Sequence, residues 1–414
     1  MSHTPTVHKV HYAWSICLGG TLMLFASIGL GVNVFSAFQP HLMAQVGLSN
    51  TQGAFLITVR SFFVLVGMTT AGGVAGRLGL RRGCTLSLLL LAASSFLFGA
   101  AEQFPLCCLA AAMVGLSYSW AGVIPLSLLI AGWFQDRKAL ALGIASAGTG
   151  LATILAPVPF TTLIEHFSLR VSFWAEGGLI ALLALLFWLL VRDRPEDKGL
   201  SPYRAGNHEN LPSQPQPAPV GFTSLRRAFV LSASFCVGAA TSLGISNFGV
   251  LYSTAGYDAD TVARLISVMG LCMMAGKVAC GQITDQLGGR ISNYLLYFLV
   301  LGGYGLCCLA NLGSVSLAYL AMILSGLGLP LSAVSQPIWA RDLWGEEGYE
   351  RGLKWIQSIY ALGIFLMGTV PGALADRTGS YVPAYVLFWA LLLLSLVLLG
   401  YVYETTRAGR RPAH

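Results

Sequence analysis

Two basic side chains stand inside long apolar stretches of this sequence. Lys277 occurs in MMAGKVACGQ, and Arg60 occurs in LITVRSFF. A charge that cannot reach water is costly in an apolar environment, so each cation must either extend to a membrane surface or meet a negative group. The two residues are therefore candidates for binding an anion, if the stretches around them cross a membrane.

The composition is that of a membrane protein. Of the 414 residues, 55% are hydrophobic and 10% are charged, whereas soluble domains average about 25% charged residues. The apolar residues come in blocks of roughly 18 to 26, the length that an α-helix needs to cross a bilayer core. We predict twelve transmembrane helices, with boundaries uncertain by a few residues, near 14–38, 51–75, 84–101, 105–131, 140–164, 171–191, 227–252, 260–283, 291–311, 315–338, 353–375 and 381–403.

The distribution of basic residues predicts the orientation of these helices. Most of the 24 Lys and Arg residues fall on one side of the predicted membrane, while Arg170, Arg264 and Arg377 fall on the other. Basic loops stay in the cytoplasm, so both termini are predicted to be cytoplasmic. The N-terminal segment is polar and the first block is long enough to span, so we expect a multi-pass protein of the plasma or inner membrane without a cleaved signal.

The chain divides into two halves joined by a linker. Residues 193–225 are rich in proline and charge and lack apolar periodicity, which is typical of a linker. It joins a predicted six-helix bundle at 1–192 to a second at 226–414. The halves also repeat in sequence, because GLSNTQGAFLITVRS and GYDADTVARLISVMG align at an offset of 209 residues. Repeated halves with a binding site between them are typical of secondary transporters.

Other classes of protein fit the sequence poorly. No HExxH motif, phosphate-binding loop or pair of histidines on one span is present, so we expect no enzyme, no metal and no cofactor. The nine cysteines fall in or beside spans without CxxC spacing and are interpreted as small apolar residues. The net charge of +7 lies mainly on one membrane face, which argues against nucleic acid as the partner.

Two loops carry a family resemblance. GGVAGRLGLR and GQITDQLGGR resemble the signature loop of the major facilitator superfamily, Gly-x-x-x-Asp-Arg-x-Gly-x-Arg, in which charges can hold helix ends together in one gating state. The first copy has Gly76 at the acidic position, and only the second keeps an acid, so we expect an asymmetric gate. The predicted gating residues are Gly72, Arg77, Gly79, Arg81, Gly281, Asp285, Gly288 and Arg290.

Two further segments resemble one branch of that superfamily. WFQDRKALALGIASAGTG (133–150) looks like a signature of the monocarboxylate transporters, and PGALADRTGSY (371–381) resembles them and the related oxalate/formate antiporters. The acidic motif that many members carry before the first span is replaced here by HKVHYAW. The resemblance implies an all-α membrane protein with twelve transmembrane helices in two pseudo-symmetric six-helix bundles, the major facilitator fold.

The resemblance also suggests roles for polar residues inside the spans. Lys277 matches a basic residue, commonly arginine, that binds the substrate carboxylate, although a snorkelling lysine is the alternative. Tyr118 matches a tyrosine that faces the substrate. Arg60 matches no family motif and either binds substrate or pairs with Glu176, a possible proton or ion-pair partner. Weaker substrate-binding candidates, each of which could instead join helices, are Asn33, Asn247, Gln336 and Tyr360.

The expected function is transport of small organic anions by alternating access. Proton-coupled transport of a monocarboxylate such as lactate or pyruvate fits the resemblance, with the lipid bilayer as environment and a functional monomer. One alternative is an oxalate/formate-type dicarboxylate–monocarboxylate antiporter, an interpretation that is favoured if Lys277 and Arg60 face the same cavity. A second is a drug/proton exporter, but LAPVPFTT replaces the Gly-Pro-x-x-Gly-Gly motif that such exporters carry in span five.

Overall fold

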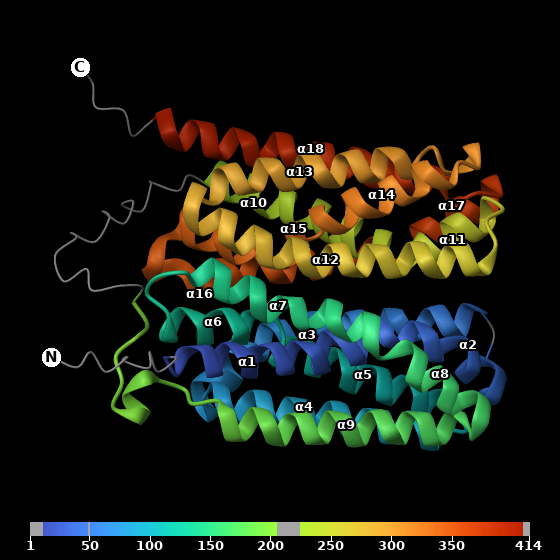
Figure 1. Cartoon of the computed structure of the whole chain (residues 1–414), viewed down its shortest axis with the longest axis horizontal. Coiled ribbons are helices and arrows are strands. Elements are labelled where there is room, and N and C mark those ends of the chain that lie inside the picture. The colour runs from blue at the N-terminus through green and yellow to red at the C-terminus, as the bar shows by residue number, and fades with distance from the viewer. Residues whose placement is uncertain (1–10, 49, 205–223, 409–414) are drawn as a thin grey trace, which may run out of the picture.

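The computed structural model describes residues 11–48, 50–204 and 224–408. Within these residues the chain is almost entirely helical, and long helices run side by side in two bundles (Figure 1). The first half of the chain, blue to green, forms one bundle, and the second half, yellow to red, forms the other. We call the end of the molecule where α1 begins and α18 ends the basic end, because Arg81, Lys138 and Arg290 lie there.

The helices of each half follow one another as six spans. In the first half they are α1 (Ala13–Leu24) with the π-helix η1 (Phe25–Val34) and α2 (Phe35–Val46), α3 (Asn50–Leu78), α4 (Leu80–Ala100), α5 (Phe104–Trp120) with α6 (Val123–Trp133), α7 (Lys138–Leu155) with α8 (Pro157–His166), and α9 (Leu169–Leu190). In the second half they are α10 (Ser224–Val237) with the π-helix η3 (Gly238–Ser242) and α11 (Leu243–Thr254), α12 (Ala259–Leu287), α13 (Gly289–Cys307), α14 (Val315–Gly328) with α15 (Pro330–Ala333) and the start of α16 (Ser335–Met367), the rest of α16 with α17 (Val370–Thr378), and α18 (Val382–Ala408).

Twelve spans result, as the sequence predicts. In the described part of the chain, eleven helical stretches are long and apolar enough to cross a membrane. The twelfth is α13, which is more polar because it carries Arg290 and Asn293 in its first turns. The tenth and eleventh spans run into one another as α16, but Gly345 breaks the helix with φ of 72° and ψ of 179°. The predicted fold class is confirmed.

The two halves share their turns as well as their helices. Gly47 and Gly256, 209 residues apart, have φ of 72° and 88°, and Gly79 and Gly288, at the same offset, have φ of 78° and 86°. A positive φ is strained for residues with a Cβ, so glycine is required at these turns. The sequence repeat therefore reflects a repeat in backbone geometry.

Several spans near the contact between the bundles are interrupted. The first and seventh spans each contain a π-helical segment, η1 and η3, and such segments occur frequently at functional sites. Pro157, Pro330 and Pro371 each begin a new helical segment where a span is broken, because proline lacks the N–H that would continue the helix. The spans formed by α3, α4, α9, α12, α13 and α18 are continuous.

The two bundles meet most closely along α7 and α12, which face one another in Figure 1. A Cβ on Gly143 would collide with the carbonyl oxygen of Lys277, and a Cβ on Gly281 would collide with the carbonyl oxygen of Ala139. Each helix thus supplies a glycine where the other's backbone approaches. Small residues permit this close packing between helices inside membranes.

Part of the predicted linker lies against the first bundle. Residues 205–223 fall outside the described residues, but Pro195–Lys198 form a short 3-10 helix. The backbone N–H of Tyr203 donates to the carbonyl of Trp133 at 2.8 Å, and its ring packs against those of Trp14 and Phe134. This end of the linker therefore docks on the basic end of the bundle through aromatic contacts.

The α7–α12 contact generates a stability prediction. Gly143→Ala should lower the melting temperature of the purified protein, because the added methyl group must displace the backbone of α12. Overpacking of this kind typically costs about 1–3 kcal/mol. The matched control is Gly132→Ala, since nothing lies within 4 Å of a Cβ at that position. Equal melting temperatures for the two variants would contradict the close approach.

Candidate functional site

Lys277 lies between the two bundles with its side chain buried. Only 4% of the residue is exposed. Its ammonium group donates to the carbonyl oxygen of Ser146 at 3.3 Å and to the hydroxyl of Thr149, both on α7 of the other bundle. In the part of the chain that the structure describes, no carboxylate forms an ion pair with it. The lysine is thus held by neutral oxygen atoms.

The direction of this side chain argues against snorkelling. The carbonyl of Lys277 lies against Gly143, whereas its ammonium reaches Thr149, six residues farther along α7 from the basic end. Six helical residues correspond to about 9 Å. In a helix the Cα–Cβ bonds tilt towards the N-terminus, and the N-terminus of α12 lies at the opposite end of the molecule. The charge therefore points into the membrane rather than out of it.

Hydrogen bonds connect Lys277 to the first span. The amide of Asn33, on η1, donates to the hydroxyl of Thr153 at 3.1 Å, and that hydroxyl donates to the carbonyl oxygen of Thr149 at 2.9 Å. Asn33 and Lys277 were both predicted from sequence, whereas Thr149 and Thr153 were missed. Their i, i+4 spacing places them on one face of α7, and this spacing was the available signal.

Arg60 occupies a different environment. It is half-buried and lines a small cavity with Gly31, Phe35 and Phe98, all residues of the first half. Tyr118 lies close enough to interact electrostatically with Arg60 and also with Tyr360 of the second half. Lys277 does not line this cavity.

The remaining candidates fall at separate places. Glu176 is buried on α9 and hydrogen-bonds to Ser95 of α4, so the suggested pairing with Arg60 is not formed. Asn247 donates to the carbonyl of Leu243 in its own helix at 2.7 Å. Glu176 finds its partner on α4 because α9 packs against that helix. Asn247 finds its partner in its own helix because a side-chain amide can donate to the carbonyl one turn back.

Two candidates on the second half lie in the interior between helices. Gln336 is fully buried and accepts a 2.6 Å hydrogen bond from the amide of Gln357, while its own Nε2 has no hydrogen-bond partner. Tyr360 is buried among Thr241, Ser242 and Ser332, hydroxyl-bearing residues of the seventh and tenth spans. Tyr360 therefore lies next to both Tyr118 and the π-helical segment η3.

The predicted gating motif of the second half bridges the two bundles. One carboxylate oxygen of Asp285 accepts from the backbone N–H of Ala139 at 3.2 Å, and the other accepts from that of Leu140 at 2.8 Å. These N–H groups belong to the first turn of α7, which has no internal partners for them. A carboxylate is favoured there by the helix dipole as well. The structure thus holds the bundles together at the basic end.

The motif of the first half forms contacts within its own bundle. The backbone N–H of Arg81 donates to Asp193 at 2.6 Å, and the guanidinium of Arg81 lies 3.9 Å from the ring centre of Trp188. Arg290, the equivalent residue of the second half, pairs with Glu404. Both arginines therefore fix the sixth or twelfth span to its neighbour rather than joining the bundles.

The first half has no acid equivalent to Asp285. Nothing lies within 4 Å of a Cβ at Gly76, and Arg77 is exposed at the end of α3. Across the interface, Oε1 of Glu350 on α16 would lie 3.4 Å from a Cβ on Gly72. The contacts of the two copies therefore differ, because Asp285 joins the bundles and the equivalent position in the first half is Gly76.

Hydrogen exchange tests the Asp285 contact. Asp285→Ala should increase amide exchange in the first turn of α7, at Ala139 and Leu140, because both N–H groups lose their acceptor. Exchange in the first turn of α4, where Asp193 is the acceptor, provides the control and should stay unchanged. Asp193→Ala should give the reverse pattern. Unaltered exchange at α7 in Asp285→Ala would show that this contact does not hold the helix.

Comparisons with known proteins agree with this architecture. The family model described as Major Facilitator Superfamily matches residues 21–366. Monocarboxylate transporter 12 of Xenopus laevis is 26% identical over 327 residues, which cover 70% of this chain and 66% of that protein. The human protein of the same name is 28% identical over 306 residues, which cover 67% of this chain and 58% of that protein. The chain therefore spans less than two thirds of the length of these relatives.

A solved structure shares the fold. The proton:xylose symporter XylE superposes with a TM-score of 0.73 at 13% identity, covering 94% of this chain and 96% of that one. This chain belongs to the Major Facilitator Superfamily, a family of membrane transporters rather than enzymes. Its curated relatives place it among proteins similar to the monocarboxylate transporters, as the sequence motifs predict.

Proposed function

We propose that the protein transports a small organic monocarboxylate together with a proton, by alternating access between its two bundles. The observation that carries this proposal is the buried ammonium of Lys277, which lies between the bundles on neutral oxygen atoms. A buried charge without a counter-ion is costly. A substrate carboxylate would supply the missing negative charge.

The similarity to proteins named Monocarboxylate transporter 12 supports this class of substrate. In our proposal, Thr149 orients the ammonium, Asn33 holds Thr149 and Thr153 in place, and Tyr118 and Tyr360 donate hydrogen bonds to the substrate. Lysine provides a point charge rather than the two-pronged guanidinium of arginine. This suits a ligand that offers one carboxylate.

The proposed coupling follows from the charge of the lysine. In our proposal the transported proton is the one that the Lys277 ammonium carries: the substrate anion pairs with it, the neutral pair crosses, and release of both leaves an uncharged amine on the empty carrier, so neither form moves an unpaired charge inside the membrane. Asp285 must then release the first turn of α7 for the basic end to open. From the positive-inside rule we propose that this end faces the cytoplasm. We also propose that a single chain in the bilayer suffices for transport.

The placement of Arg60 bears on the alternative of oxalate/formate-type exchange. A dicarboxylate is best held by two cations in one cavity. Arg60 instead lines a cavity formed by residues of the first half, with Phe35 and Phe98 as neighbours. Proton-coupled monocarboxylate transport is therefore preferred over oxalate/formate-type exchange. No observation specifically favours a drug/proton exporter.

The central test is uptake of radiolabelled L-lactate into proteoliposomes with and without an inward proton gradient. Lys277→Ala should reduce gradient-stimulated kcat/KM by at least about tenfold, because a charge-assisted hydrogen bond contributes roughly 1.5–3 kcal/mol. Lys277→Arg should retain part of the activity, and Lys198→Ala, at an exposed lysine, should behave as wild type. Uptake that survives in Lys277→Ala would refute the assigned role of the lysine.

A second test separates symport from exchange. Vesicles preloaded with formate should show no accelerated uptake of oxalate, and Arg60→Gln should affect lactate uptake less than Lys277→Ala does, because Arg60 lies in a separate cavity. Formate-driven oxalate uptake that is insensitive to a proton gradient and is abolished in Arg60→Gln would replace the proposal with the antiport alternative.

A further inference from the structure

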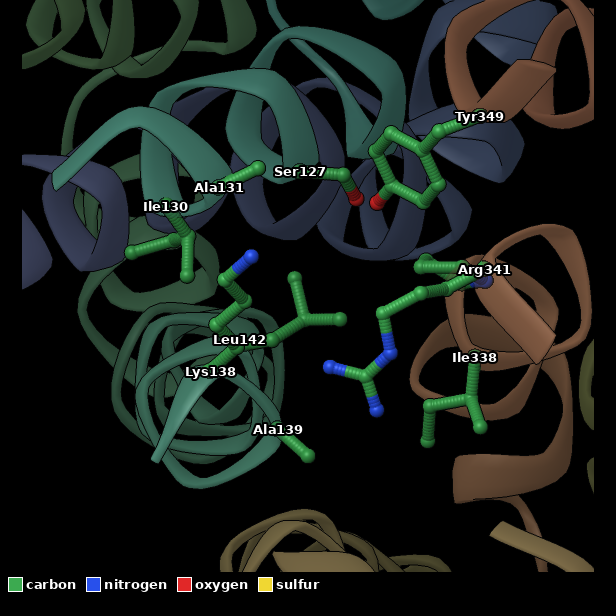
Figure 2. Close-up of a pocket in the computed structure, with 10 residues that line it drawn as sticks. Ser127, Ile130, Ala131, Lys138, Ala139, Leu142, Ile338, Arg341 and Tyr349 are labelled. Carbon is green, nitrogen blue, oxygen red and sulfur yellow. The ribbon is translucent and has the colours of Figure 1, made fainter. Parts of the chain in front are cut away.

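The outer face of the first bundle carries three arginines at the basic end. This face is formed by α4 and α9, which pack side by side at the edge of the molecule farthest from the second bundle (Figure 1). Arg81 and Arg82 lie in the first turn of α4, and Arg192 lies two residues after the end of α9. We call these three residues the arginine cluster. It is separate from the small pocket between the bundles that Lys138 and Arg341 line (Figure 2).

Two guanidinium groups of the arginine cluster converge on one carbonyl oxygen. Nε of Arg81 donates to the carbonyl of Trp188 at 2.9 Å, and Nη1 of Arg192 donates to the same oxygen at 3.3 Å. Arg82 is exposed and lies near enough to Arg81 to interact electrostatically. Like charges at this distance repel one another, and an anion bound between them would offset the repulsion.

The protein does not supply enough negative charge for these cations. Among the described residues, Asp193 is the acid that interacts electrostatically with Arg81, and it already accepts from the backbone N–H of Arg81 at 2.6 Å. In the part of the chain that the structure describes, no guanidinium group of the arginine cluster forms an ion pair with a carboxylate. The cluster therefore keeps a net positive charge.

The second half provides an internal comparison. Arg290, the equivalent of Arg81, forms an ion pair with Glu404. Ile291, the equivalent of Arg82, carries no charge. The arginine on the outer face of the second bundle is thus neutralised within the protein, whereas the arginine cluster of the first bundle is not. The missing counter-charge of the cluster can come from outside the chain.

The surroundings of the arginine cluster suit a lipid headgroup. The ring centre of Trp188 lies 3.9 Å from the guanidinium carbon of Arg81, and tryptophan is enriched where the hydrocarbon core of a bilayer meets water. Farther along the same two helices, large apolar side chains are exposed, namely Leu86, Leu89 and Phe96 of α4 and Leu182, Leu185 and Leu189 of α9. Positive charge thus stands at the end of a surface that acyl chains can cover.

We propose that an anionic phospholipid of the leaflet at the basic end binds to this face, with its phosphate between Arg81 and Arg192 and its acyl chains along α4 and α9. Guanidinium groups bind phosphate oxygens through paired N–H groups. Basic sites between transmembrane helices are known to bind anionic headgroups. A soluble phosphate would meet the arginines but would leave the leucines uncovered, so a lipid is the ligand that fits both parts of the face.

The bound lipid ties the end of α9 to the beginning of α4, because its phosphate contacts an arginine from each. This junction also includes the turn between α3 and α4, since Oδ2 of Asp193 would lie 2.6 Å from a Cβ on Gly79. A ligand that binds the folded protein stabilises it by mass action. Anionic lipid in this leaflet therefore stabilises the first bundle at its basic end.

Native mass spectrometry of the full-length protein in a neutral detergent tests the site. Phosphatidylglycerol should stay bound to the wild type at concentrations at which phosphatidylcholine does not. Arg82→Gln should weaken the binding of phosphatidylglycerol about fivefold, because it removes one cation near the headgroup. The double variant Arg81→Gln/Arg192→Gln should lose the preference for phosphatidylglycerol altogether. The matched control is Arg351→Gln, which removes an exposed arginine of the second half and should bind as the wild type does.

The inference does not rest on the proposed function, and Lys277→Ala should keep the lipid preference whether or not it transports lactate. If the double variant does not fold, Arg82→Gln decides the test, since the structure records no hydrogen bond of that side chain. Equal binding of the two lipids, or an undiminished preference in Arg82→Gln, overturns the proposal. Displacement of phosphatidylglycerol by inorganic phosphate at equal concentration would assign the arginines to a soluble anion and contradict the lipid site.

Discussion

The close approach of α7 and α12 is the contact on which the rest of the molecule depends. Two glycines allow the helix backbones to meet at the basic end, since a Cβ at Gly143 or Gly281 would strike a carbonyl of the opposite helix. The same approach brings Lys277 within reach of α7 and places Asp285 on the first turn of that helix. The hydrogen bonds that hold Lys277 and the contact of Asp285 that joins the bundles thus depend on the same pair of helices.

The internal repeat supplies a symmetric frame that carries asymmetric chemistry. Glycines with positive φ recur at the same offset, and both the first and seventh spans contain a π-helical segment. Lys277, Arg60 and Asp285 have Met68, Met269 and Gly76 at the equivalent positions of the other half. The backbone repeats because the two bundles pack in similar ways, whereas in our proposal the substrate and the contact that closes the basic end each need only one charged residue.

Four cations of the described interior and interface lie at three separate places. Lys277 lies with Thr149 between the bundles, Arg60 lines a cavity within the first bundle, and Lys138 and Arg341 line a pocket at the basic end. This separation explains how one carrier can hold several cations without strong repulsion, because distance and intervening side chains keep them apart.

The sequence by itself determined the twelve spans, the repeated halves and the identity of the intramembrane charges. These follow from local properties, namely the length of apolar blocks, the glycines required at positive φ and the rarity of charge in such blocks. It could not decide the direction of Lys277, the separation of Arg60 from it, or the pairing of Glu176 with Ser95 rather than Arg60. It also missed Thr149 and Thr153, because hydroxyls within helices are common. Only the tertiary structure decided these points, since they depend on which helix faces which and at what depth.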